Sequence, residues 1–254
     1  MMVALYQTYE GNVAIGMSKS DFDLHWNQDL REMPAYRIEE AAHYLRIPKS
    51  TVRSWVVGYP YRTKADRKYF RPIITPASQT PRLLSFMNLV EIHVLDAIRR
   101  KHKISLEKVR RTVNYLKQEF PSKHPLADQE FETDGINLFI EKYGQLIGIS
   151  EDGQLVMKEI VRAYLRRVER DTAGVPVKLY PFTRERVSDE PKLIVIDPRI
   201  SFGQPVIAGT GIWTATIAER YKAGESIEEL AYDYDLQPFQ IEEAIRCELH
   251  LKAA

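Results

Sequence analysis

The chain has 254 residues, of which 44% are hydrophobic and 28% are charged, and its formal net charge is +1. These values are ordinary for a soluble globular protein and leave room for one large domain or two to three small ones. No stretch approaches the roughly 18 apolar residues of a membrane span, and the N-terminus lacks a basic region followed by an apolar one, so we expect a cytoplasmic protein. The single cysteine, Cys247, excludes an internal disulfide framework.

The small net charge hides a strong asymmetry along the chain. Residues 1–187 contain 30 basic and 23 acidic residues, whereas residues 188–254 contain 6 basic and 12 acidic ones. Within the first part, Arg37 to Lys117 alone holds 18 basic and 6 acidic residues. This split predicts one part that meets phosphates and another that does not.

Residues 1–33 show no clear hydrophobic period and are interpreted as an arm. From residue 34 to about 120 the pattern predicts a winged helix-turn-helix. Apolar residues from Ile38 to Leu45 have the spacing of one helical face, and a second short helix is expected from about Lys49 to Val57. The aromatic and basic segment 59–75 is predicted to form a β-hairpin, and two longer helices are expected after it.

The rest of the chain is predicted to complete an α+β fold. In the middle α+β region, residues 121–187, strands are expected at 131–133, 136–141, 145–149 and 175–182, with a helix over 155–170. Asp134-Gly135 and Tyr143-Gly144 are expected to form hairpin turns between the first three strands. Residues 188–254 are expected to form a small helical, helix-turn-helix-like domain. Its helices are predicted at about 215–223, 227–234 and 239–250, the second begun by a capping box from Ser226 to Glu229.

The first helix-turn-helix supplies candidate DNA-binding residues. A recognition helix places its N-terminal side chains near base edges, where arginine can bind guanine and serine or threonine can reach phosphate or base. A basic hairpin would add phosphate contacts. Each cation could also be a solvated surface residue, whereas Tyr44 and Trp55 are expected in the core. The candidates are Lys49, Ser50, Thr51, Arg53, Ser54, Arg62, Lys64, Arg67, Lys68 and Arg71.

Residues Tyr36, Ala41, Ala42, Leu45 and the run from Ser50 to Trp55 resemble the MerR-type helix-turn-helix. One departure is Arg46, where that family commonly has glycine, so a differently shaped turn is possible there. Classical members end in a coiled coil and an effector domain, which are not expected in residues 121–254 of this sequence.

The C-terminal segment resembles a small domain of antitoxins in the VapBC class. The motifs that carry the resemblance are Pro198, Gly203-Gln204-Pro205, Gly209-Thr210, the run from Ala223 to Ser226, and Ala244. A familiar variant has arginine after Gly-Thr, where this chain has Gly211. The resemblance implies an antitoxin that neutralises a PIN-like ribonuclease toxin and represses its own operon by binding operator DNA. A homodimer is expected, because one recognition helix reads too little sequence.

The acidic C-terminal domain favours a protein partner over DNA. Its last helix carries Glu242, Glu243 and Glu248 against Arg246 alone, a face that phosphate would repel. The aromatic residues of this domain are either contact residues or core. The candidates for the protein contact are Trp213, Tyr221, Tyr232, Tyr234, Phe239 and Glu242.

An enzyme, a cofactor and a metal site are not expected. The six histidines show no metal-ligand spacing, and Gly209-Thr210-Gly211 is too short for a dinucleotide-binding motif. Two alternatives to the antitoxin stay open. One is a ligand-responsive transcriptional regulator with a sensor pocket between Leu126 and Phe182, and the other is a protein-interaction adaptor that does not bind DNA.

Overall fold

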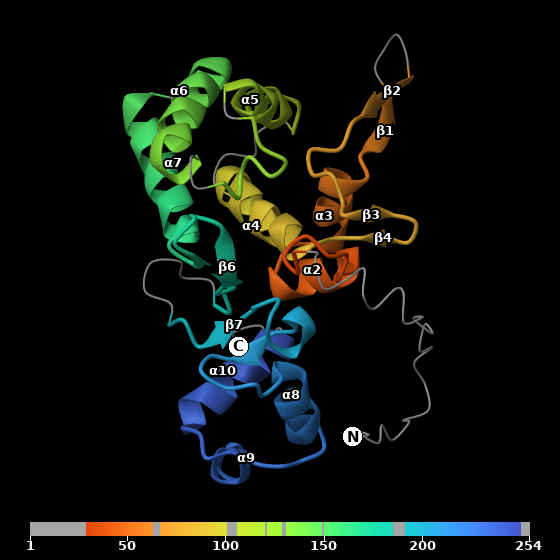
Figure 1. Cartoon of the computed structure of the whole chain (residues 1–254), viewed down its shortest axis with the longest axis vertical. Coiled ribbons are helices and arrows are strands. Elements are labelled where there is room, and N and C mark those ends of the chain that lie inside the picture. The colour runs from red at the N-terminus through yellow and green to blue at the C-terminus, as the bar shows by residue number, and fades with distance from the viewer. Residues whose placement is uncertain are drawn as a thin grey trace, which may run out of the picture.

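The structure is a computed structural model that describes residues 29–62, 67–100, 106–119, 121–128, 131–148, 150–184 and 191–249. Helices and four two-stranded antiparallel sheets alternate along it (Figure 1). The elements are α2 (Ile38–Tyr44), α3 (Lys49–Val56), β1 (Tyr59–Arg62), β2 (Arg67–Phe70), β3 (Ser78–Gln79), β4 (Arg82–Leu83), α4 (Phe86–Arg100), α5 (Leu106–Glu119), the π-helix η1 (Phe131–Gly135), α6 (Ile136–Ile147), α7 (Glu151–Leu165), β5 (Val168–Arg170), β6 (Pro176–Leu179), β7 (Ile194–Val195), the 3-10 helix η2 (Ser201–Gly203), β8 (Val206–Ile207), α8 (Thr214–Lys222), α9 (Ile227–Tyr234) and α10 (Pro238–Leu249). No helix in these ranges is both long and apolar enough to cross a membrane.

The predicted helix-turn-helix is confirmed as α2 and α3. The inward residues of α2 are Ile38, Ala41 and Ala42, and those of α3 are Val52, Trp55 and Val56; all are buried. In the turn between the helices, Arg46 adopts a left-handed conformation with φ of 54°. Glycine takes this conformation without steric cost, so Arg46 keeps the turn shape that a glycine would give. Its guanidinium donates a 2.6 Å hydrogen bond to the carbonyl of Arg246.

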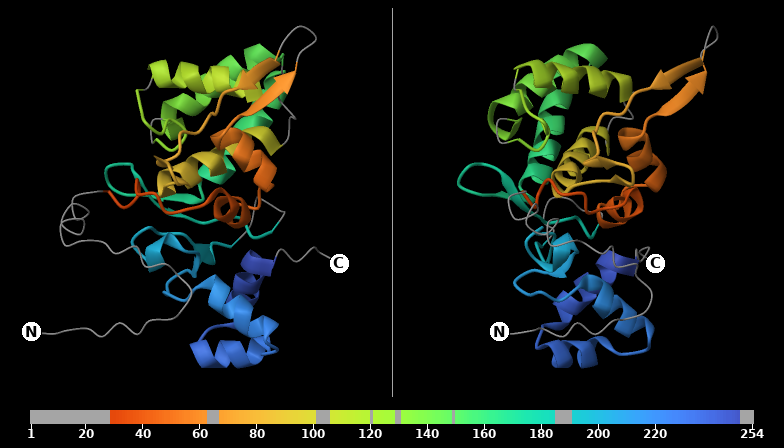
Figure 2. Two further views of the ribbon diagram at one scale, coloured as in Figure 1. Left: turned by 90° about the vertical axis from the view of Figure 1, so that its right-hand side faces the viewer. Right: turned by 45° about the vertical axis from the view of Figure 1, so that its right-hand side comes forward.

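The predicted hairpin after α3 is also confirmed. Strands β1 and β2 pair antiparallel with Tyr59 opposite Phe70 and Arg62 opposite Arg67. Figure 2 shows this hairpin, the wing, projecting from the end of the molecule that is farthest from α8, α9 and α10. A second, shorter hairpin formed by β3 and β4 follows it in the chain and has no counterpart in the sequence prediction.

The middle region is more helical than its sequence pattern suggested. Strands were expected at 136–141 and 145–149, but α6 covers 136–141 and 145–147, and 131–133 lies in the π-helix η1; residue 149 lies outside the described residues. The reason is visible in Ile136, Phe139 and Ile140, which are spaced as one helical face and are all buried. Gly144 is not a turn residue; it lies against Gln154 of α7, where a Cβ would overlap that side chain. The strand expected at 175–182 is present as β6, paired with β5.

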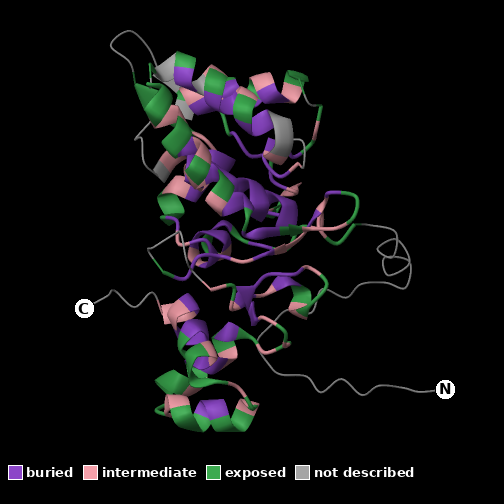
Figure 3. Cartoon of the chain, turned by 90° about the vertical axis from the view of Figure 1, so that its left-hand side faces the viewer, coloured by how far each residue is buried: buried purple, intermediate pink, exposed green. Residues whose placement is uncertain are grey.

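The winged helix and the middle region share one hydrophobic core. Trp55 of α3, Leu89 of α4, Phe139 of α6 and Tyr164 of α7 belong to one cluster of buried side chains. Helix α4 lies at its centre, with Leu89, Val90, Ile92, Val94 and Leu95 buried on all sides. Figure 3 shows the buried residues of this part in purple, concentrated towards its middle.

The C-terminal domain has a separate, smaller core under α8, α9 and α10. Ile207, Ile217, Leu230 and Ile241 are buried in it. The three helices begin and end within about two residues of their predicted limits, and Ser226 and Glu229 form the predicted capping box. The short sheet of β7 and β8 connects this domain to the larger core through Ile196, which pairs with Leu179.

Helix α2 and Tyr36, which precedes it, are hydrogen-bonded to the C-terminal domain. The Tyr36 hydroxyl donates to the Gly203 carbonyl at 3.0 Å, and the Tyr44 hydroxyl donates to Gln204 Oε1 at 2.6 Å. Burial raises the pKa of both tyrosines, so both hydroxyls remain protonated donors. His43 Nε2 lies 3.0 Å from Glu248 Oε2. The Gly203-Gln204-Pro205 motif therefore fixes the C-terminal domain against the back of the helix-turn-helix.

Replacing Gly203 with alanine tests this contact. Both Gly203 and Gly209 have positive φ, 75° and 81°, but a Cβ at Gly203 would overlap the Tyr36 hydroxyl, whereas nothing lies within 4 Å at Gly209. We expect Gly203→Ala to lower the free energy of unfolding by about 1–3 kcal/mol more than Gly209→Ala, measured by urea denaturation. Tyr36→Phe in the same chain should recover part of the loss. Equal effects of the two alanines would contradict the close contact.

Candidate nucleic-acid interface

The first two turns of α3 present polar side chains to solvent. Ser50 and Arg53 are exposed, while Val52, Trp55 and Val56 on the opposite face are buried. Lys49 is exposed too, and its ammonium lies 2.7 Å from Glu39 Oε1. Because both partners of this pair are more than half exposed, the pair contributes little stability, and Lys49 is able to exchange Glu39 for a phosphate.

The other two predicted residues of α3 are less available. Thr51 and Ser54 are half-buried, and the Ser54 hydroxyl donates a 2.7 Å hydrogen bond to the Thr51 carbonyl. This is the common way in which serine satisfies its hydroxyl within a helix. The structure therefore brings together Lys49, Ser50 and Arg53 on one exposed surface and leaves Ser54 engaged with its own backbone.

The wing adds an exposed strand next to α3. All four residues of β1, Tyr59 to Arg62, are exposed, and so is Arg71 after β2. Lys64 lies outside the described residues, as do the side chains of Arg67 and Lys68, whose backbone forms part of β2.

Aromatic residues of the wing were not among the predicted site residues. The Tyr59 ring stacks on Phe70 with centroids 5.2 Å apart, and the Arg110 guanidinium of α5 lies 5.0 Å from the Phe70 centroid. Tyr69 donates its hydroxyl proton to the Val57 carbonyl at the end of α3. These contacts fix the wing to α3 and α5. The signal in the sequence was the dense alternation of aromatic and basic residues in 59–75.

The structure corrects the expectation that α10 presents an acidic face. Glu243 is fully buried and accepts hydrogen bonds from Thr183, from Arg184 at 2.6 Å and from Arg246 at 2.8 Å. Burial alone would raise the pKa of Glu243, but these donors lower it. Glu248 points to α2 and α8 rather than to solvent, since it binds His43 and Thr214. Of the three glutamates only Glu242 is exposed, because consecutive helical positions face different directions.

The aromatic candidates of the C-terminal domain also include both exposed and packed residues. Trp213, Tyr221, Tyr232 and Phe239 are exposed, and Tyr232 is the most exposed of them at 89%. Tyr234 is half-buried against the small core and lies under the Arg220 guanidinium, 5.1 Å from it. Tyr234 is therefore a packing residue.

Two segments of the chain match known families. Residues 34–113, which contain α2, α3 and the wing, match a family described as "Putative DNA-binding HTH domain". Residues 194–246, which contain most of the C-terminal domain, match a family described as "Protein of unknown function (DUF433)".

A longer match covers both segments. "Putative antitoxin VapB45" of Mycobacterium tuberculosis (strain ATCC 25618 / H37Rv) is 31% identical over 234 residues, covering 84% of this chain and 93% of the relative. This chain belongs to the VapB45 family. A second relative from the same strain, "Uncharacterized protein Rv2308", is 27% identical over 217 residues, covering 83% of this chain and 88% of the relative. The crystal structure of Rv2018 from Mycobacterium tuberculosis matches with a TM-score of 0.63 and 25% identity, covering 84% of this chain and 98% of that one.

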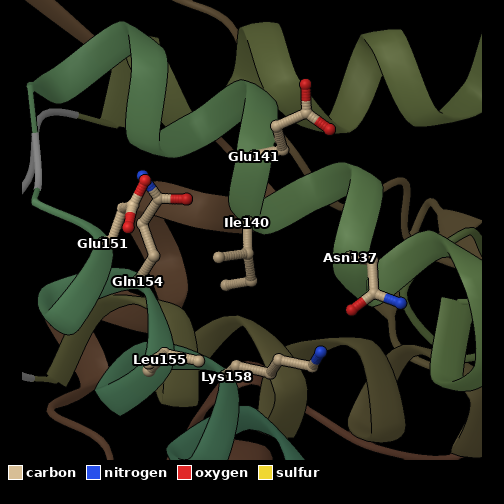
Figure 4. Close-up of a pocket in the computed structure, with 7 residues that line it drawn as sticks. All are labelled: Asn137, Ile140, Glu141, Glu151, Gln154, Leu155 and Lys158. Atoms are coloured by element: carbon tan, nitrogen blue, oxygen red, sulfur yellow. The ribbon is translucent and has the colours of Figure 1, made fainter.

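The middle region of this VapB45-family chain contains an open cavity of about 330 Å³ between α6 and α7. In Figure 4 the side chain of Ile140 points into the centre of the cavity, with Asn137, Gln154 and Lys158 around it. Leu155 adds a second apolar side chain to the lining. This is where the alternative of a sensor pocket would place a ligand.

Groups that would support catalysis are not apparent in the described ranges of this VapB45-family chain. No three residues among the described histidines, cysteines, aspartates and glutamates are grouped to hold a metal ion. Burial raises the pKa of the Cys247 thiol to about 12, so it stays protonated and is a poor nucleophile.

Proposed function

We propose that this VapB45-family protein is the antitoxin of a type II toxin-antitoxin system, which neutralises a PIN-like ribonuclease toxin and represses its own operon. The printed name of its 31% identical relative supports the antitoxin role, and the match of residues 34–113 supports DNA binding. Both similarities are to binding proteins and favour a non-enzymatic role.

The observation that carries this proposal is the separation of two chemically different surfaces. Lys49, Ser50 and Arg53 on α3 and Arg62 on the wing are exposed. We assign base and phosphate contacts to the three residues of α3 and phosphate contacts to Arg62 and Arg71. Helices α8, α9 and α10 of the acidic C-terminal domain lie on the side of α2 that faces away from the wing (Figure 1).

A homodimer on operator DNA completes the proposal. A single α3 helix reaches only a few base pairs, too few to specify a site in a genome. Two copies bound to two half-sites, one helical turn of DNA apart or a multiple of it, would supply the missing specificity.

Co-expression of the full chain with the product of the adjacent reading frame tests the proposal. We expect the two proteins to purify together, the complex to lack ribonuclease activity, and the full chain to shift its own promoter fragment in a salt-sensitive manner. If neither co-purification nor promoter binding is observed, the antitoxin proposal is wrong. Promoter binding without a toxin partner would instead favour a transcriptional regulator, and a toxin partner without DNA binding would favour an adaptor.

The cavity between α6 and α7 favours a ligand-responsive regulator as the second candidate. Its apolar lining from Ile140 and Leu155, with polar groups of Asn137, Gln154 and Lys158, suits a small amphipathic molecule. Native mass spectrometry of the purified full chain tests this function. A bound small molecule whose removal changes promoter affinity would support the regulator over the antitoxin.

A further inference from the structure

Two aromatic rings are held in solvent on α9 and α10. Tyr232 is 89% exposed near the end of α9, and Phe239 is 53% exposed at the start of α10. An exposed ring contributes little to the stability of a soluble protein, so two large exposed rings on consecutive helices are candidates for a protein contact. We use the name α9–α10 face for the exposed residues of α9, the turn after it and α10, which are Glu228, Tyr232, Asp235, Phe239 and Glu242. On α9, Glu228 and Tyr232 are four residues apart, and on α10, Phe239 and Glu242 are three apart, so each pair shares one side of its helix.

Hydrogen bonds and packing hold the turn between α9 and α10 in place. Asp235 has a left-handed backbone with φ of 51°, and Leu236 donates its N–H to the Ala231 carbonyl at 2.9 Å. Tyr234 and Leu236 pack against the small core behind the turn. The Gln237 N–H donates to Gln240 Oε1 at 3.0 Å and closes the first turn of α10. Little conformational entropy is therefore lost when a partner covers Tyr232 and Phe239.

The charge around the rings restricts the partner. Glu228, Asp235 and Glu242 are exposed, and none of these three carboxylates has an ion-pair partner in the described part of the chain. DNA is excluded because its phosphates would be repelled. A second copy that used the same face would place carboxylates against carboxylates, since a two-fold contact pairs identical surfaces. The complementary surface is that of another protein, basic around apolar recesses that accept the two rings.

A ribonuclease presents such a surface where it holds its substrate, because RNA binding requires cations along the phosphate backbone and aromatic or apolar platforms for the bases. Resting on the proposed function, we propose that the α9–α10 face docks on the RNA-binding surface of the toxin and excludes RNA from it. Tyr232 and Phe239 take the places of stacked bases, and the three carboxylates take those of phosphates.

The position of the face allows both partners to bind together. Figures 1 and 2 show α9 at the opposite end of the molecule from the wing. A toxin on α9 and α10 would leave α3 and the wing free for DNA.

The test uses the full chain co-expressed with the product of the adjacent reading frame. We expect Tyr232→Ala/Phe239→Ala to lower the amount of co-purified toxin at least tenfold, and Glu228→Lys/Glu242→Lys to do the same. Phe202→Ala is the matched aromatic control, since Phe202 is also 89% exposed and lies in the same domain outside this face. Glu119→Lys/Glu141→Lys is the matched charge control on α5 and α6, where both residues are exposed. Both controls should co-purify toxin as the unaltered chain does, and promoter binding by all variants shows that they are folded.

Competition separates RNA exclusion from docking elsewhere. Added single-stranded RNA should displace the unaltered chain from the immobilised toxin in a concentration-dependent way. The same concentration of a neutral polymer should leave the chain bound. This inference is wrong, and the antitoxin proposal stands, if the α9–α10 variants co-purify as much toxin as the unaltered chain does. The same conclusion follows if RNA does not displace the unaltered chain from the toxin. If the unaltered chain does not co-purify with the toxin, both this inference and the antitoxin proposal are wrong.

Discussion

The double substitution Lys49→Ala/Arg53→Ala is expected to weaken binding of the full chain to its own promoter by about 30-fold or more at moderate salt. An arginine bonded to guanine contributes about 1–3 kcal/mol of discrimination, and each lysine on a phosphate contributes through counterion release. Fluorescence anisotropy over a salt series measures both the affinity for the promoter and its dependence on salt. The slope of log affinity against log salt should fall by about one for the lost phosphate contact.

Controls separate DNA contact from a general loss of positive charge. Arg162→Ala/Lys222→Ala removes one exposed arginine on α7 and one exposed lysine on α8, away from α3 and the wing. It should leave the affinity within about twofold. Glu39→Ala frees Lys49 from its 2.7 Å ion pair and should keep or raise the affinity. Equal losses in both double variants would argue against α3 as the recognition helix.

Helices and strands that are determined by local sequence patterns could be predicted well. In α2, α3, α8 and α9, apolar residues recur with the helical period, and proline, glycine or a capping box marks the ends. The wing followed from its aromatic and basic composition between two turns. The outward position of Ser50 and Arg53 followed from the burial of Val52 and Trp55 on the same helix.

Features that depend on contacts between distant segments were missed or misjudged. Gly135 and Gly144 suggested hairpin turns, yet Gly135 lies in η1 directly before α6, and Gly144 lies within α6, where its lack of a Cβ admits Gln154. Glu243 appeared to be a surface charge because nothing local shows that Arg184, 59 residues away, reaches it. The Gly203-Gln204 motif was recognised, but its partners Tyr36 and Tyr44 lie about 160 residues away along the chain.

A second large effect is expected at a buried charge cluster beside α4. His124 is only 5% exposed, with Nδ1 2.8 Å from Glu91 Oε2 and Nε2 3.1 Å from Glu32 Oε2. Lys123 lies 2.6 Å from the same Glu32 oxygen. Because both ring nitrogens face carboxylates, both act as donors and His124 is the charged imidazolium. Burial alone would lower the pKa of His124, but Glu91 and Glu32 raise it.

His124→Ala should lower the free energy of unfolding by about 3–5 kcal/mol. The substitution leaves the Glu91 carboxylate, itself buried in the larger core, without its cation. Urea denaturation followed by circular dichroism measures the loss. His43→Ala is the matched control, because His43 binds Glu248 from a position that is about one third exposed and should lose about 1 kcal/mol. A loss of that small size in His124→Ala would contradict an ionic cluster.

The dependence on pH distinguishes the loss of an ion pair from the loss of packing. A histidine whose pKa is raised by folding contributes its full stabilisation below its unfolded pKa of about 6.5, and the contribution disappears as pH rises through the higher folded pKa. The difference in free energy of unfolding between the unaltered chain and His124→Gln should therefore be largest near pH 6. It should shrink as the pH rises through the pKa of His124 in the folded state. Glu32 works in the opposite direction, since its lowered pKa stabilises the fold above its unfolded pKa, so a series from about pH 6 upward isolates the histidine. A difference that stays constant over this series would mean that His124 stabilises α4 by its shape rather than by its charge.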